Sequence, residues 1–127
     1  MLYALIIVCA FSNMSSAKKK KLSPDQLLAV SRLFAALAEP SRLAILQALQ
    51  EGPLTVTELI DACEMKQANV SKHLTVLHSL KLVTRERDGI SIHYQIADPM
   101  IFSLCNLVCA KMEKDSKEAA AIFAPSI

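Results

Sequence analysis

Apolar residues recur at helical spacing through the first half of this chain and predict two consecutive helices. The first helix opens at Ser23-Pro24-Asp25, where the serine can cap the helix, the proline suits its first position and the aspartate complements the positive end of the dipole. Its apolar face contains Leu27, Leu28, Val30, Leu33, Phe34 and Leu37. Glu39-Pro40 ends this helix, because a residue before proline avoids the α conformation. A second helix begins at Ser41 and ends at Gly52-Pro53.

The middle of the chain predicts two further helices separated by a tight turn. The first covers residues 57–62, with Thr55 or Thr57 as its cap and Glu58 near its positive end. The second covers residues 67–79 and carries an apolar stripe at the i, i+4, i+7 spacing that faces a core. That stripe consists of Val70, Leu74, Leu77 and Leu80. Small polar residues begin this second helix outside the stripe, so its first turns can enter a DNA major groove and touch base edges.

Two short β-like runs follow at residues 82–87 and 90–96, and Asp88-Gly89 between them is a strong hairpin turn signal. A last helix begins after Asp98-Pro99 and has a broad apolar face. Together these elements predict a mainly α fold with a small β-hairpin, that is, a winged helix-turn-helix of about five helices.

The apolar faces of the first and last helices are wider than a three-helix core with a small hairpin can cover. Burying a Leu or Phe contributes about 1.5–3 kcal/mol, and an exposed stripe of such residues usually marks an interface. A two-fold dimer through these two helices would cover both stripes. It would also place two recognition helices one duplex turn apart, about 34–36 Å.

The length of 127 residues fits one domain, which we expect at residues 23–114, followed by a frayed tail at 115–127. Residues 1–22 form an apolar leader and a basic arm. The apolar run is too short for a bilayer, and its lysines follow it instead of preceding it, the reverse of an export signal. We expect residues 1–13 to come from an upstream start. Lys18–Lys21 form either a disordered arm that adds salt-dependent DNA affinity or a solubilising tail.

The formal charge of +2 decides little, but its distribution is more informative. Five basic residues and one acidic residue lie between positions 66 and 87: Lys66, Lys72, Lys81, Arg85 and Arg87 against Glu86. Such local charge suits a phosphate backbone, although a solvated helix face would look the same.

These features together resemble the ArsR/SmtB family of winged helix-turn-helix repressors over about residues 25–112. The resemblance is carried by Leu37-Ala38-Glu39-Pro40-Ser41-Arg42-Leu43-Ala44-Ile45-Leu46, by Val56-Thr57-Glu58-Leu59, by residues 67–77 and by the hairpin from Leu82 to Tyr94. It implies a homodimer that binds a double-stranded operator near its own promoter. It further implies an inducer that weakens this binding and releases transcription.

On the recognition helix, the resemblance transfers five candidates for DNA contact: Gln67, Asn69, Ser71, Lys72 and His73. The amides of Gln67 and Asn69 can bond adenine edges, while Ser71 and Lys72 can reach bases or phosphates. His73 either bonds a phosphate or packs as a partly buried residue.

On the predicted wing, Arg85, Arg87 and His93 are expected to meet phosphates or the minor groove, unless the hairpin is an ordinary solvated one. Arg42, at a helix start, is expected to make a backbone contact or an intradomain salt bridge.

The inducer sites that the resemblance implies are missing from this sequence. Family members that sense arsenite or soft metals carry Cys-Val-Cys on the third helix, where this chain has Thr55-Val56-Thr57, and hydroxyls are poor ligands for soft ions. Zinc-sensing members use Asp and His on the last helix and a later His or Glu. Asp98 is present here, but no histidine follows His93.

The four cysteines are Cys9, Cys63, Cys105 and Cys109, with no Cys-x-x-Cys pair, and they fit a reducing cytoplasm better than a disulfide framework. Cys105 and Cys109 share one helix face at i, i+4. They can bind a soft metal ion or metalloid, or respond to oxidants, or they simply pack as small hydrophobes. Cys63 is expected to pack.

The leading interpretation is therefore a dimeric repressor released from its operator by a soft metal, a metalloid or a thiol-reactive inducer. The alternative is a winged-helix repressor without a small-molecule ligand, controlled by its abundance or by a protein partner. An enzyme is not expected, because the chain has only Gly52 and Gly89, no phosphate-binding loop and no Cys/His pair in one motif. No membrane partner is expected either.

Overall fold

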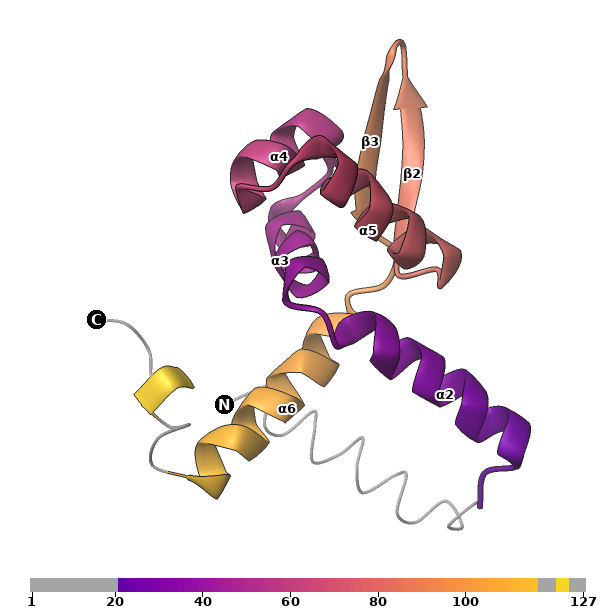
Figure 1. Ribbon diagram of the computed structural model, residues 1–127, viewed down its shortest axis with the longest axis vertical. Coiled ribbons are helices and arrows are strands. Elements are labelled where there is room, and N and C mark those ends of the chain that lie inside the picture. The colour runs from indigo at the N-terminus through magenta and orange to yellow at the C-terminus, as the bar shows by residue number, and fades with distance from the viewer. Residues whose placement is uncertain (1–20, 117–120, 124–127) are drawn as a thin grey trace. The chain divides into compact units, whose positions relative to one another are not determined.

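The computed structural model describes residues 21–116 and 121–123 (Figure 1). The elements in chain order are α2 (Pro24–Leu37), α3 (Pro40–Ala48), the 3₁₀ turn η1 (Leu49–Glu51), β1 (Leu54–Thr55), α4 (Val56–Cys63), α5 (Gln67–Ser79), β2 (Val83–Asp88), β3 (Ser91–Ile96) and α6 (Met100–Asp115). The chain divides into two units, one from Leu22 to Asp98 and one that contains α6. The leader expected at residues 1–13, the arm residues Lys18–Lys20 and most of the expected tail lie outside the described residues.

The predicted helix boundaries are confirmed at α2. The start of α3 differs by one residue, and its end differs more, because the helix stops at Ala48 and the 3₁₀ turn η1 fills the segment before the expected stop at Gly52-Pro53. Ser23 caps α2 in a capping box, in which the Gln26 N–H donates to Ser23 Oγ (3.2 Å) and the Ser23 N–H donates to Gln26 Oε1 (2.8 Å). Helix α3 begins at Pro40, one residue before the expected Ser41, because proline fits the first helical position and Glu39 serves as the cap. The Ser41 N–H donates to the Glu39 carboxylate at 3.3 Å.

The helix-turn-helix consists of α4 and α5. Thr55, not Thr57, caps α4, and its hydroxyl accepts from the Glu58 N–H (3.2 Å) while the Thr55 N–H donates to Glu58 Oε1 (3.0 Å). These bonds lower the pKa of the Glu58 carboxyl. Glu64 then adopts a left-handed conformation (φ 52°), which turns the chain into α5.

The sheet has three antiparallel strands in the order β1-β3-β2. Asp88 pairs with Ser91, so the hairpin turn is Gly89-Ile90 and not the expected Asp88-Gly89. Gly89 supplies the positive φ (65°) that this two-residue turn requires. Strand β1 was not predicted, because two residues are too few to show alternation.

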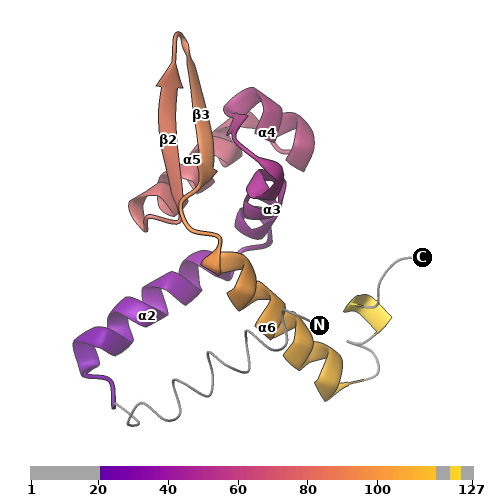
Figure 2. The same ribbon diagram turned by 180° about the vertical axis from the view of Figure 1, so that it is seen from behind.

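The core of the Leu22–Asp98 unit gathers one apolar face from each helix. Its buried members are Ala36, Ile45, Leu46, Leu49, Leu59, Val70, Leu74, Leu77 and Val83. Leu80, the fourth member of the predicted stripe, is only half-buried. Both the helix-turn-helix and Val83, at the start of β2, contribute to this core. In Figures 1 and 2, β2 and β3 extend beyond helices α4 and α5.

Apolar side chains on α2 and α6 stay exposed in the single chain. On α2 these are Leu27, Leu28, Val30 and Phe34, and on α6 they are Met100, Val108 and Met112. In the part of the chain described, no helix is both long enough and apolar enough to cross a bilayer.

The cap of α4 yields a prediction that separates Thr55 from its neighbour. Thr55→Ala removes the capping box and should lower the free energy of unfolding by about 1 kcal/mol, whereas Thr57→Ala should change it little. Equal losses for the two threonine variants would contradict the assigned cap.

Because the pKa of Glu58 is lowered in the folded chain, the stability that its carboxylate contributes is present above the ordinary value of 4.5 and is lost as the pH falls through the folded pKa. The free energy of unfolding of Glu58→Gln, measured by urea denaturation, should therefore fall less on acidification than that of the parent.

Candidate nucleic-acid interface

Helix α5 has a buried face and an exposed polar face. Val70, His73, Leu74 and Leu77 are buried and hold the helix to the core. Four of the five predicted DNA-contact residues on this helix are exposed: Gln67, Asn69, Ser71 and Lys72. The structure thus brings these polar side chains to the surface on the first two turns of one helix.

The N-terminal end of α5 suits a phosphate. Its cap residue Lys66 makes no side-chain capping bond, and no acidic residue lies in the first turn. The first N–H groups of the helix have no partner within it, and the positive end of the helix dipole lies beside them. The charged side chain at this end is that of Lys66, and the first turn has no carboxylate to neutralise it. Such an end attracts the oxygens of a phosphate group.

His73 does not belong to the exposed set. It is 9% exposed and lies in the buried face of α5. Its Nδ1 is 3.4 Å from Nη1 of Arg42, and because arginine can only donate, a hydrogen bond here requires the tautomer in which Nδ1 accepts. The burial contradicts the expected contact with a phosphate and favours the alternative, a partly buried packing residue. The reason is register: position 73 falls three residues after Val70, on the core side of the helix.

Arg42 bonds to main-chain carbonyls of its own chain, and among the described residues it forms no ion pair, so the expected intradomain salt bridge is not seen. Its Nε donates to the carbonyl of Ala36 at 2.6 Å, and Nη2 donates to the carbonyl of Ala35 at 3.3 Å. Both carbonyls belong to the last turns of α2. The place of Arg42 at a helix start follows from the sequence, but these partners do not, because they depend on the angle between α2 and α3.

The three wing candidates do not share one face of the hairpin. Residues of β2 two positions apart point to the same side, so Arg85 and Arg87 lie together and both are exposed. His93 pairs with Glu86 and points to the opposite side, where it is half-buried. Ile90, at the tip, is completely exposed (101%), although its place in the alternating pattern suggested a strand residue. The exposed basic side chains of the wing are therefore those of β2.

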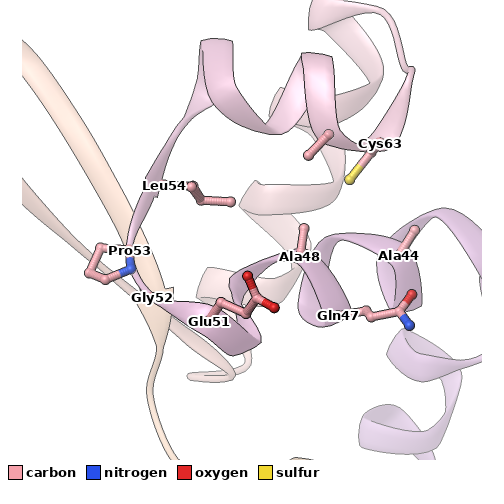
Figure 3. Close-up of a pocket in the computed structure, with 9 residues that line it drawn as sticks. Ala44, Gln47, Ala48, Glu51, Gly52, Pro53, Leu54 and Cys63 are labelled. Carbon is pink, nitrogen blue, oxygen red and sulfur yellow. The ribbon is translucent and has the colours of Figure 1, made fainter.

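Cys63 lies at the edge of a hollow of about 640 Å³ formed by α3, η1, β1 and α4 (Figure 3). Across the hollow from Cys63 are Gln47 and Ala48 of α3, and Glu51 lies beside them. Burial raises the pKa of the Cys63 thiol, which favours its protonated form over the reactive thiolate. This supports the expected packing role.

Cys105 and Cys109 are free, half-buried thiols on α6. The pKa of Cys105 is raised by burial and also by the neighbouring Cys109. Within the described residues, no group of three or more His, Cys, Asp or Glu side chains could hold a metal ion. Two thiols of one chain are thus an incomplete site, and a soft ion would need further ligands from elsewhere.

Comparison with known proteins gives consistent matches. Residues 37–86 match the helix-turn-helix domain family. The transcriptional regulator NmtR of Mycobacterium tuberculosis is 47% identical over 75 residues, which are 59% of this chain and 62% of NmtR. The match therefore spans less than two thirds of that relative.

Two solved structures are similar over most of their length. One is the homodimeric winged helix-turn-helix DNA-binding domain of Mb0332 from Mycobacterium bovis, a possible ArsR-family transcriptional regulator (TM-score 0.64, 31% identity, 74% of this chain and 91% of that one). The other is the antimony-specific transcriptional repressor AntR (TM-score 0.65, 34% identity, 78% of this chain and 91% of that one).

The thiols of α6 give a prediction about reactivity. We expect iodoacetamide at about pH 8 to alkylate Cys105 more slowly than free cysteine, because burial and Cys109 keep Cys105 protonated. Mass spectrometry of timed digests measures the rate at each cysteine. In the unfolded chain, Cys105 should react as fast as free cysteine, and equal rates before and after unfolding would contradict this account.

Proposed function

Because this chain belongs to the ArsR/SmtB family of winged helix-turn-helix transcriptional regulators, we propose that it is a homodimeric repressor that binds operator DNA in the cytoplasm. The observation that carries the proposal is the division of α5 into a buried stripe and an exposed polar face. The proposed role is binding and not catalysis.

In the proposed complex, the first two turns of α5 lie in the major groove. Gln67 and Asn69 present amides that can bond to N6 and N7 of adenine. Ser71 and Lys72 reach bases or phosphates. Arg85 and Arg87 extend along the hairpin toward the backbone or the minor groove, where basic side chains are attracted by the negative potential. His93 is a weaker candidate, because it is half-buried beside Glu86 on the other face.

The proposed dimer uses the apolar faces of α2 and α6. Leu27, Leu28 and Phe34 on α2 are between 50% and 55% exposed, and covering them removes apolar surface from water. The homodimeric state of the similar Mycobacterium bovis domain supports this assignment. A two-fold axis would present two α5 helices to successive half-sites of an operator.

For the inducer, we propose a soft metal ion, a metalloid or a thiol-reactive compound that acts at Cys105 and Cys109. Their i, i+4 spacing on α6 places both thiols on one face, and a second protomer could supply the ligands that one chain lacks. The similarity to an antimony-specific repressor supports a metalloid in particular. Binding of a metal ion would displace the thiol protons. The raised pKa of Cys105 therefore lowers the affinity for such an ion but does not prevent binding.

The alternative, a repressor without a small-molecule ligand, also has support. Thr55-Val56-Thr57 replaces the soft-metal motif, and the Thr55 hydroxyl is already used as the cap of α4. In that case the protein is controlled by its abundance or by a protein partner, and the thiols of α6 only pack.

The proposed DNA contacts can be tested by substitution. Asn69→Ala should weaken binding to the upstream promoter fragment by about 1–3 kcal/mol and relax sequence preference, whereas Lys72→Ala should reduce the slope of log affinity against log salt by about 0.9. Fluorescence anisotropy titrations at several salt concentrations measure both. Asn106→Ala and Lys114→Ala, exposed positions on α6, are matched controls and should bind like the parent. An Asn69 variant with the operator affinity of the parent would contradict the proposed interface.

The proposed inducer site can be tested in the same way. Arsenite, antimonite, cuprous ion or polysulfide should release the parent from DNA but leave the double variant Cys105→Ser, Cys109→Ser bound, as monitored by gel shift. Cys63→Ser, which changes the packed thiol, should keep the parent's response. A double variant that responds like the parent would show that the thiols only pack, and a parent that none of these compounds releases would favour the ligand-free alternative.

A further inference from the structure

Arg42 connects two helices that have different proposed roles. Its guanidinium donates to the carbonyls of Ala36 (2.6 Å) and Ala35 (3.3 Å) in the last turns of α2. The third nitrogen, Nη1, lies 3.4 Å from Nδ1 of His73 on α5, across 31 residues of sequence. One planar side chain therefore touches the end of the helix proposed for dimerisation and the middle of the helix proposed to read DNA.

The end of α2 needs such a donor. Of the two carbonyls, that of Ala35 also accepts from the Ala38 N–H at 3.2 Å, whereas that of Ala36 lies four residues before Pro40, which has no N–H to donate. A positive charge near this end of the helix is favourable. Helix α2 has no basic residue in its own last turn, so Arg42 of α3 supplies this charge. Ala36 is 3% exposed and its carbonyl could not easily turn to water instead.

The bond to His73 restricts the rotation of α5. Val70, Leu74 and Leu77 hold this helix by apolar contacts, which have little directionality. A hydrogen bond to a ring nitrogen depends on direction as well as distance. His73 follows Lys72 directly and lies about one helical turn after Asn69. A small rotation of α5 about its axis, which moves His73, therefore also displaces the side chains of Lys72 and Asn69.

From these contacts we propose that Arg42 is a positioning residue that couples α2 to α5 through His73. A change in α2, such as a rearrangement of the dimer, is transmitted to the angle at which Gln67 and Asn69 meet the bases. The inference deepens the proposed function and rests on it. It predicts that loss of the link lowers operator specificity, while the phosphate contacts stay as they are.

The test compares specific with non-specific binding. Lysine keeps the charge at position 42 but has a single nitrogen that cannot serve two carbonyls and a ring together. Arg42→Lys and His73→Leu should each lower the ratio of operator affinity to random-sequence affinity roughly tenfold, with non-additive effects in the double variant. The salt dependence should not change, because no phosphate contact is removed. Arg32→Lys, an exposed arginine on α2, is the matched control and should keep the parent's ratio.

A purely structural role for Arg42 would give a different result. Variants that only lose stability would bind operator and random DNA like the parent once the folded fraction, measured by circular dichroism, is taken into account. That result in both single variants would overturn the proposal. If instead the parent binds no upstream DNA with preference over random DNA, the proposed function itself fails, and the two failures are distinguishable.

A measurement on the parent covers the case in which the variants do not fold. In a ¹⁵N spectrum of the histidine rings, His73 should show an unprotonated Nδ1 and a protonated Nε2, since arginine can only donate. A folded parent in which Nδ1 of His73 carries the proton would overturn the proposal, because the bond to Arg42 would then be absent.

Discussion

The attachment of α5 by one face is the constraint on which the proposed function depends. Val70, Leu74 and Leu77 are almost completely buried, and their burial fixes which side of the helix is exposed for the proposed contact with DNA. If this stripe were one residue out of register, each residue would turn by about 100° around the helix, and Lys72 would move toward the core. The same apolar contacts that stabilise the unit therefore decide which polar side chains can meet bases.

Polar contacts determine where the helices begin and how they are joined, within the arrangement that the apolar core stabilises. The capping box of Thr55 and Glu58 begins the first helix of the helix-turn-helix at a defined residue, and Arg42 joins the end of α2 to α5. The cap fixes where α4 begins, and the proposed role of Arg42 is to fix the orientation of α5. A regulator requires a defined helix orientation to recognise one sequence among many similar ones.

Much of this arrangement could be predicted from the sequence, and the reasons differ by element. The bounds of α5 were predicted correctly, because a regular apolar stripe and a tight turn before it leave little choice. Strand β1 was missed, since its pairing with β3 is made by residues distant in sequence. The orientation of His73 and the opposite faces of Arg85 and His93 depend on helix register and strand pairing, so the residue types alone could not settle them. The partners of Arg42 required the angle between two helices.

The central claim is that the exposed face of α5 is the surface that meets DNA. The most direct test is a ¹H–¹⁵N spectrum of the labelled protein titrated with its upstream promoter fragment. The account predicts that the largest shifts fall on the amides of Gln67 to Lys72, followed by Arg85 and Arg87. Shifts confined to α2 and α6, with the α5 amides unchanged at saturation, would contradict it.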